Sequence, residues 1–350
     1  MINIVKPLLN WYDRNARELP WRRNPSPYRV WISEIMLQQT RVEAGKGYFL
    51  RWMEELPHVE ALANVTDEKL MKLWQGLGYY NRARNLKKAA GIIMEQYGGV
   101  LPHSYEELLA LPGIGPYTAG AIGSIAFGLP VVAVDGNVLR VVARLTADKD
   151  DIGSLATKRK MEKLLESIIP EERPGDFNQA LMELGALICI PNGGPKCDQC
   201  PVSEACEAHS LGIEADLPVR APKKARKVEK RTILILQNND RILLHKREDK
   251  GLLAGLWELP GLDGVPGPEE IKSVMEQRGL LVKDIQALPE AKHIFSHIEW
   301  HMTGFIAEVE MSGPEEKPRW VWADRQDLKT RYALPSAFRY YMEFLTDAGI

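Results

Sequence analysis

The chain has 350 residues, of which 45% are hydrophobic and 26% are charged, and its formal net charge is −2. This length predicts two or three domains, and the composition is that of an ordinary globular protein. The near-zero net charge neither indicates nor excludes a nucleic-acid partner, which would need only a local basic patch. The N-terminus is amphipathic and charged, unlike a secretory signal, and no segment is long and apolar enough to span a bilayer. We therefore expect an intracellular, cytoplasmic protein without membrane contact.

Residues 1–20 predict a short amphipathic helix, followed by a helix over residues 28–43 that contains one acid, Glu34, within an apolar run. Burial of this carboxyl would raise its pKa, because a charged group is poorly solvated in a protein interior. A carboxylic acid that keeps its proton near neutral pH can act as a general acid. Alternatively, Glu34 lies on the solvated face of an amphipathic helix.

Helices are also expected near residues 45–56, 67–74 and 81–97, with a glycine-rich turn at 76–80 between the last two. Two glycines make a tight, exposed turn, and the aromatic side chain of Tyr79 could wedge between DNA bases. The turn is equally consistent with a helix cap and two core tyrosines. The basic residues that follow form either a phosphate-binding face or a solvated one; they are Arg82, Arg84, Lys87 and Lys88.

The segment 111–137, LPGIGPYTAGAIGSIAFGLPVVAVDGN, predicts a turn, a small-residue helix over 117–127 and a second turn before the next helix. Gly113 and Gly115 would let backbone N–H groups approach an anion at the N-terminus of that helix. Asp135 stands in the second turn, at the start of the following helix. The structural alternative is a helical hairpin with two turn glycines and an N-cap aspartate.

LPGIGPYTAGAI followed by VDGN resembles the helix-hairpin-helix signature of the endonuclease III and MutY family of DNA glycosylases, and WISEIMLQQTRV resembles the MutY-type segment. The resemblance implies a hairpin that binds a DNA phosphate through Gly113 and Gly115, a catalytic Asp135, and a Glu34 that protonates adenine. GLGYY resembles the family's wedge loop, which favours Tyr79 as an intercalating residue. The residues that the resemblance places at the DNA or in the adenine pocket are Arg17, Trp21, Arg22, Leu37, Gln38 and Gln39.

Helices are expected near 137–147, 157–169 and 176–190, and the last leads into four cysteines with the pattern C-x7-C-x2-C-x5-C. Clustered thiols, with none elsewhere in an intracellular chain, favour a metal site over disulfides. Zinc and a [4Fe–4S] cluster both accept four thiolates. The family's cluster loop is C-x6-C-x2-C-x5-C, so this chain has one more residue near the turn 192–194. We expect a structural [4Fe–4S] cluster, with zinc as the alternative, at Cys189, Cys197, Cys200 and Cys206.

Residues 217–231 are rich in proline and lysine and predict an interdomain linker. From Thr232 onward the periodicity changes, and TILILQ and RILLHK, separated by a polar turn, predict a β-hairpin. Together with the elements that follow, this pattern indicates an α+β domain. Further strands are expected at 300–310 and 319–323, and helices at 268–279 and 335–347.

GLLAGLWELPG, at 251–261, resembles the start of a Nudix motif. The helix that follows lacks the REUxEE core needed to bind magnesium, so Nudix hydrolysis is not expected. The domain instead resembles the MutT-like C-terminal domain of MutY, and HIFSHIEWH resembles its FSH loop. This resemblance implies recognition of 8-oxoguanine by Phe295, Ser296 and His297.

The predicted architecture is multidomain. An all-α helix-hairpin-helix glycosylase region with an iron–sulfur loop, over residues 1–216, is followed by the linker and by an α+β Nudix-like domain over 232–350. Within the first region we expect a six-helix subdomain at about 27–134. The iron–sulfur subdomain would combine about 1–26 with 135–216.

The expected function is that of a monomeric, monofunctional DNA-repair glycosylase, which flips out and hydrolyses adenine opposite 8-oxoguanine or guanine in duplex DNA. Glu34 would protonate the base, Asp135 would stabilise the cationic sugar, and Asn137 would orient Asp135 or water. One alternative is a bifunctional glycosylase and lyase of the endonuclease III type, whose Schiff-base lysine would stand where this chain has Tyr117. The other is a non-enzymatic helix-hairpin-helix DNA-binding module.

Overall fold

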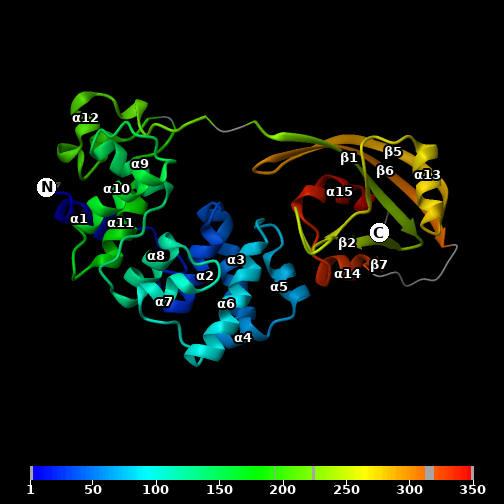
Figure 1. Ribbon diagram of the computed structural model, residues 1–350, viewed down its shortest axis with the longest axis horizontal. Helices are drawn as coiled ribbons and strands as arrows, with labels where there is room; N and C mark the ends of the chain where they lie inside the picture. The colour runs from blue at the N-terminus through cyan, green and yellow to red at the C-terminus, as the bar shows by residue number, and fades with distance from the viewer. Residues whose placement is uncertain (1–2, 193, 223–224, 312–318, 348–350) are drawn as a thin grey trace. The chain divides into compact units, whose positions relative to one another are not determined.

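The computed structural model (Figure 1) describes residues 3–192, 194–222, 225–311 and 319–347. Backbone contacts divide the chain into two compact units. The helical unit comprises Met1–Val65 and Asn81–Pro222, and the sheet unit comprises Thr66–Tyr80 and Lys223–Ile350. Gly193 of the expected turn and residues 223–224 of the expected linker lie outside the described residues.

The helical unit consists of helices joined by short turns, and several of these helices begin at a polar capping residue. Ser26 accepts a hydrogen bond from the backbone N–H of Arg29, and Pro27 occupies the first helical position, which suits its missing N–H. Ser104 and Ser154 cap two later helices in the same way. The helices are α1 (Val5–Asn15), α2 (Pro27–Leu37), α3 (Val42–Glu55), α4 (Val59–Asn64), α6 (Asn81–Tyr97), α7 (Tyr105–Ala110), α8 (Pro116–Phe127), α9 (Gly136–Leu145), α10 (Leu155–Glu166), α11 (Pro174–Leu187) and α12 (Glu207–Leu211).

The single helix predicted over residues 28–43 is wrong, because the chain turns sharply between α2 and α3. Gln39 has a φ of 60°, in the left-handed region that ends a helix. Arg82 of α6 donates to the carbonyl oxygens of Ile35 and Met36 at 2.8 and 3.1 Å, which satisfies carbonyls at the end of α2. Gln38 and Gln39 therefore lie in a loop, called the glutamine loop below, and do not continue the helix.

The core of the helical unit is built around α11, which packs against α1, α8 and α9. Apolar side chains of α1, α9 and α11 interlock in one buried cluster that includes Leu8, Val138, Phe177 and Leu181. Gly120 of α8 permits close approach, since a Cβ there would lie 2.0 Å from the carbonyl oxygen of Val132. This packing holds α8, α9 and α11 together around the site described below.

The sheet unit contains a mixed seven-stranded sheet with the order β3-β2-β1-β6-β5, in which β4 pairs with β1 and β7 pairs with β2. The predicted hairpin forms, with Asn238 opposite Arg241, while β1 and β6 run parallel. The strands are β1 (Lys227–Asn238), β2 (Arg241–Lys246), β3 (Trp257–Glu258), β4 (Gly261–Asp263), β5 (Leu280–Ile294), β6 (Ile298–Met311) and β7 (Trp320–Ala323). β1 therefore begins within the residues expected to form the linker.

Alternate residues of β1 point to opposite faces of the sheet, and each face has its own buried core. Ile233 and Ile235 pack toward α15 (Arg339–Asp347), whereas Leu234 and Leu236 pack toward α13 (Pro268–Gln277). The two helices thus lie on opposite faces of the sheet (Figure 1).

The residues Thr66–Tyr80 group with the sheet unit even though they lie far from it in sequence. They form α5 (Asp67–Trp74) and the glycine-rich turn. Lys72 Nζ donates to the carbonyl oxygen of Leu328 at 2.8 Å, and Gln75 Nε2 donates to that of Leu334 at 3.1 Å.

The predicted fold class is confirmed, because a helical region is followed by a sheet-containing α+β domain. No helix among the described residues has the length and apolar character required to cross a membrane.

Candidate active site

A pocket of about 700 Å³ in the helical unit is lined by residues from α2, α8, α11 and the turns between helices. It brings together side chains that are far apart in sequence, including both carboxyls predicted to be catalytic. The predicted site residues that line it are Arg17, Trp21, Arg22, Glu34, Leu37, Gln38, Gln39, Tyr117, Asp135 and Asn137.

Glu34 projects from α2 and is 8% exposed, so it does not lie on a solvated helix face. Burial raises the pKa of its carboxyl to about 7. The hydrogen bond from Tyr117 and the charge of Arg22 lower this pKa, whereas the charge of Asp135 raises it. Near neutral pH a large fraction of Glu34 is therefore protonated and able to donate a proton.

Tyr117, on α8, donates its hydroxyl proton to Oε2 of Glu34 at 2.6 Å. Burial, together with the charges of Glu34 and Asp135, raises the pKa of this phenol well above its usual value. The side chain therefore stays neutral and acts as a fixed donor at one oxygen of Glu34.

Asp135 is the N-cap of α9, and three donors hold its carboxylate. Oδ1 accepts from the backbone N–H groups of Asn137 and Val138 at 2.9 and 2.7 Å, and Oδ2 accepts from Asn137 Nδ2 at 2.8 Å. A helix N-terminus favours negative charge. The capping alternative is thus correct as local structure, yet the same carboxylate lines the pocket together with Glu34.

A chain of hydrogen bonds continues from Asp135 toward the cysteines. Asn137 Oδ1 accepts from Arg140 Nη2 at 3.0 Å, and Arg140 Nε donates to the carbonyl oxygen of Cys189 at 2.8 Å. Arg144, one helical turn later, donates to Cys189 Sγ at 3.3 Å. Both arginines are less than 10% exposed, so they join the pocket to the cysteine loop through buried, directional bonds.

A second buried network forms the wall of the pocket beside α1. Glu183 of α11 accepts hydrogen bonds from Arg17 and Arg22, and Arg22 Nε also donates to Oε1 of Gln179 at 3.0 Å. Trp21, between the two arginines in sequence, packs edge-on against Phe49 with ring centroids 5.5 Å apart. Arg17, Trp21 and Arg22 thus line one pocket, and their role at the adenine stays a prediction.

The four cysteines form a candidate metal site. Cys189, Cys200 and Cys206 all pack against the apolar core of α9 and α11. The pKa of Cys197 and that of Cys200 are raised to about 11, mainly by burial. The bond to Glu214 also raises the pKa of Cys197, and charge on neighbouring cysteines contributes to both shifts. Thiols that sense one another's charge in this way suit a bound cation, which would stabilise the thiolates.

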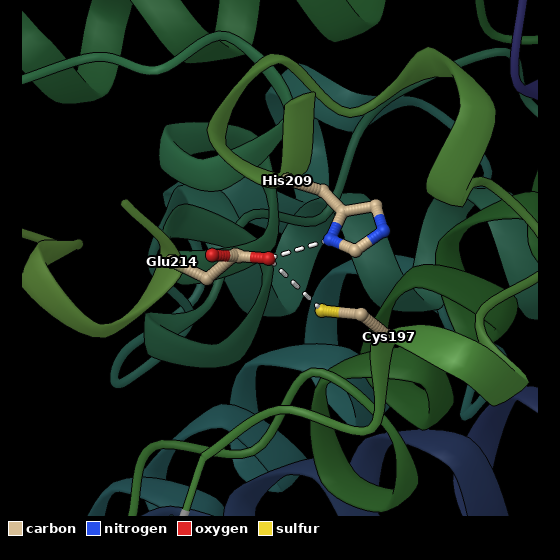
Figure 2. Close-up of side chains that lie close together, drawn as sticks. All are labelled: Cys197, His209 and Glu214. Atoms are coloured by element: carbon tan, nitrogen blue, oxygen red, sulfur yellow. Dashed lines mark hydrogen bonds and ion pairs between the residues drawn. The ribbon is translucent and has the colours of Figure 1, made fainter. Parts of the chain in front are cut away.

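Cys197 also lies beside two further possible metal ligands (Figure 2). Oε1 of Glu214 is 2.6 Å from Nδ1 of His209 and 3.6 Å from Sγ of Cys197. One ligand atom from each of the three residues lies within 4.8 Å of the others. Among the described residues, the geometry thus groups Cys197 with His209 and Glu214 as possible metal ligands. A centre held by all four cysteines stays a prediction.

The predicted helix-hairpin-helix turn lies between α7 and α8. Gly113 has a φ of 80°, and a Cβ there would come within 2.7 Å of Asn85 Cβ, so only glycine fits. Gly115 is the N-cap of α8, and a Cβ at that position would meet open space. Its surroundings leave room for an anion close to the helix N-terminus.

In the sheet unit, the predicted wedge and the predicted FSH loop lie together. Tyr79 has a φ of 48° and is 54% exposed, and its hydroxyl lies 2.8 Å from Oγ of Ser296. Phe295 is anchored by an edge-on contact with Trp300 at 4.9 Å, while Ser296 and His297 are exposed in the turn between β5 and β6.

Comparison with known proteins identifies the family. A model of the HhH-GPD superfamily of base excision DNA repair proteins matches residues 32–171, and a NUDIX domain model matches residues 231–344. The chain is 35% identical over 399 residues to the adenine DNA glycosylase of Rattus norvegicus, covering 96% of this chain and 77% of the relative. The chain belongs to the adenine DNA glycosylase family. It is also 34% identical to the Homo sapiens adenine DNA glycosylase over 95% of this chain and 73% of that protein.

Two solved structures resemble the helical part of this family member. A thermostable thymine-DNA glycosylase is 29% identical, with a TM-score of 0.53, over 59% of this chain and 95% of that chain. A trapped endonuclease III–DNA covalent intermediate is 26% identical, with a TM-score of 0.51, over 60% of this chain and 95% of that chain. The resemblance stated from the sequence motifs is thus confirmed.

Sequence reasoning missed four residues of the site: Gln179, Glu183, Arg140 and Arg144. Glu183 stands in the apolar run ALMELGAL, so the argument that singled out Glu34 applied to it as well. Arg140 and Arg144 likewise interrupt the apolar run VLRVVARL four residues apart. Charged residues inside apolar helical runs were the available signal for Glu183, Arg140 and Arg144, whereas uncharged Gln179 offered no such signal.

Proposed function

We propose that this chain hydrolyses the N-glycosidic bond of adenine mispaired with 8-oxoguanine or guanine in duplex DNA. The observation that carries the proposal is one pocket holding two carboxyls in opposite environments. Glu34 is buried with a pKa of about 7, whereas Asp135 is held by three N–H donors at a helix N-terminus. Family membership supports the same activity.

Departure of adenine from the sugar leaves an anionic base and an oxocarbenium-like sugar. The base therefore needs a proton, and the sugar needs a nearby negative charge. Glu34 donates a proton to the base. Because Tyr117 occupies Oε2, the transferable proton resides on Oε1. Asp135 stabilises the positive charge that develops on the sugar, and Asn137 fixes the orientation of Asp135.

The base can reach this pocket only after it has been flipped out of the duplex. We assign Tyr79, Leu37 and Gln39 the role of filling the space that the flipped adenine leaves in the duplex. Tyr79 is exposed on a turn with positive φ, and the glutamine loop lines the pocket. Gly113 and Gly115 would hold a phosphate at the N-terminus of α8. Arg82 already bonds the end of α2, so we assign it a role in holding the glutamine loop beside any DNA contact.

We assign recognition of 8-oxoguanine to the domain over 232–350, through Ser296 in the turn between β5 and β6. 8-Oxoguanine differs from guanine by a carbonyl at C8 and a proton on N7, and a hydroxyl can accept from that proton or donate to that carbonyl. The ring of Phe295, packed on Trp300, keeps the turn in place.

Cys189, Cys197, Cys200 and Cys206 would hold a [4Fe–4S] cluster, with zinc as the alternative. Such a group would supply a structural cross-link for the loop after α11 rather than a step of base removal. Support comes from Cys189, Cys200 and Cys206, which pack against the same apolar core, and from Arg144, which donates to Cys189 Sγ. We expect the protein to act as a monomer.

The test is incubation with duplexes that carry A:8-oxoguanine, A:G or A:T, followed by alkali to cleave abasic sites. We expect adenine release from the first two duplexes and little from A:T. Strand cleavage without alkali, with efficient borohydride trapping, would instead indicate the bifunctional glycosylase and lyase. DNA binding without any base release would indicate a binding module.

A further inference from the structure

A second buried acid of the pocket, Glu183, has no part in the mechanism above. Its side chain is 1% exposed on α11. Oε1 accepts from the backbone N–H and Nε of Arg17 at 3.0 and 2.6 Å. Oε2 accepts from Nη2 of Arg17 and Nη2 of Arg22 at 2.9 and 3.0 Å. Four charge-assisted or backbone bonds thus converge on one carboxyl.

The carboxyl of Glu183 is ionised. Burial alone would raise its pKa, but the hydrogen bonds from Arg17 and Arg22 outweigh burial and lower the pKa to about 2. The two guanidiniums and this carboxylate together carry one net positive charge at the pocket wall.

The two arginines stand on a segment between α1 and α2 that has no regular secondary structure. Their bonds to α11 give this segment its position: Glu183 and Gln179, four residues apart on one helical face, hold Arg22, and Arg22 Nη1 donates to the carbonyl oxygen of Arg17 at 3.1 Å. Both arginines keep exposed surface, at 30% and 18%, so they still face the pocket.

We propose that Glu183 is a positioning residue, which fixes the guanidiniums of Arg17 and Arg22 as the wall that meets the flipped base and cancels one of their two charges. This inference rests on the proposed function for its kinetic test. Its electrostatic consequence concerns Glu34, because the charge of Arg22 lowers the pKa of that carboxyl. Without Glu183, the charge of Arg22 would act on the general acid without a neighbouring carboxylate to offset it.

The charged and titratable groups around the two acids are few. Glu34 faces Tyr117 of α8, Asp135 at the start of α9 and Arg22, while Arg82 of α6 bonds the end of its own helix. Glu183 faces Arg17, Arg22 and, from α1, Tyr12, whose pKa its charge helps to raise. Glu43 of α3 acts on Arg17.

The test compares four proteins under single-turnover conditions across pH: wild type, Glu183→Gln, Arg22→Gln and the double variant. The net charge of the trio is +1 in wild type, +2 in Glu183→Gln, 0 in Arg22→Gln and again +1 in the double variant. Adenine release falls on the alkaline side as Glu34 loses its proton. We expect this limb to move to lower pH in Glu183→Gln and to higher pH in Arg22→Gln, each by about one pH unit or less. In the double variant it should coincide with the limb of Arg22→Gln, because the arginine that acts on Glu34 is absent from both.

Loss of positioning should also slow excision by about 100-fold in Glu183→Gln at its own optimal pH, with duplex affinity retained. A residue that merely stabilises the fold would lower the melting temperature and the rate without moving the limb. Coincident limbs in wild type, Glu183→Gln and Arg22→Gln would overturn the proposal. If Glu183→Gln does not fold, Glu183→Asp decides, because it keeps the negative charge on a shorter side chain. It should slow excision without moving the limb, and a wild-type rate in this variant would refute the positioning role.

A measurement on the protein without DNA separates this inference from the proposed function. The carboxyl of Glu34 can be titrated by carbon NMR in glutamate-labelled protein, with Glu34→Gln identifying its signal. We expect the titration midpoint of Glu34 to be lower in Glu183→Gln than in wild type, and higher in Arg22→Gln. A wild type that releases no adenine refutes the proposed function, whereas unchanged Glu34 midpoints refute the electrostatic role of Glu183.

Discussion

Replacement of Glu34 by glutamine should abolish activity and yet stabilise the protein at alkaline pH. Burial raises the pKa of Glu34 from 4.5 to about 7. Between these values the folded protein binds a proton that the unfolded chain releases, so stability falls as pH rises. At about 1.4 kcal/mol per pKa unit, the loss reaches about 3 kcal/mol once the pH exceeds 7, as an upper bound. A neutral glutamine does not incur this loss, and its amide oxygen can still accept from Tyr117.

The assay is the difference in melting temperature between Glu34→Gln and wild type, measured from pH 5 to pH 8.5. For a unit of this size 1 kcal/mol corresponds to about 2–4 °C. We therefore expect a difference of less than about 3 °C at pH 5 and of roughly 5–10 °C in favour of the variant at pH 8. Glu18→Gln is the matched control, because Glu18 is 87% exposed and should show no such trend.

The same variant should lose adenine release by at least about 10²–10⁴-fold, while A:8-oxoguanine duplex binding is retained. A variant less stable than wild type at pH 8, or a difference independent of pH, would show that Glu34 is not a strained, protonated acid. Near-normal excision by the variant would remove Glu34 from the mechanism.

Four other outcomes are expected. Asp135→Asn should lose excision with a melting temperature close to that of wild type, because asparagine caps helices as well as aspartate does; full activity would leave Asp135 as a cap only. Tyr117→Phe removes a hydrogen bond that lowers the pKa of Glu34, so the alkaline limb of excision should move to higher pH in single-turnover profiles. Cys200→Ala should lose bound iron and visible absorption in elemental and spectroscopic analysis, whereas a colourless wild type with one zinc would refute the cluster. Ser296→Ala should reduce the preference for A:8-oxoguanine over A:G by about fivefold, the equivalent of one hydrogen bond, and equal losses on both duplexes would contradict a reading role.

The elements that the sequence revealed are those with one dominant local signal. The helices carried a cap or an apolar stripe, and the β1–β2 hairpin alternated around a polar turn. β5 (Leu280–Ile294) escaped because its pattern is broken by Pro289 and by register shifts between Val282 and Asp284 and between Leu288 and Ala291. Each irregularity moves later side chains to the other face, so period-two alternation is lost.

The site shows the same division between local and tertiary information. Glu34 and Asp135 could be predicted because each sits in a distinctive local string. The role of Glu183 depends on its bonds to Arg17, which is 166 residues away in the chain, and no local pattern indicates this pairing. The grouping of Thr66–Tyr80 with the sheet unit also depends on side-chain bonds to distant backbone, such as that of Lys72 to Leu328. Sequence spacing contains no record of such pairings.

Two buried acids of the pocket illustrate how burial alone does not decide the charge of a carboxyl. Glu34 and Glu183 are both buried, on α2 and α11, yet the pKa of the first is raised to about 7 and that of the second is lowered to about 2. The difference lies in the donors: a neutral phenol bonds Glu34, whereas two guanidiniums bond Glu183. Glu34, the proposed proton donor, can therefore be protonated near neutral pH, whereas Glu183, which binds two guanidiniums, is ionised. Exchange of these donors, rather than a change in burial, would reverse the two roles.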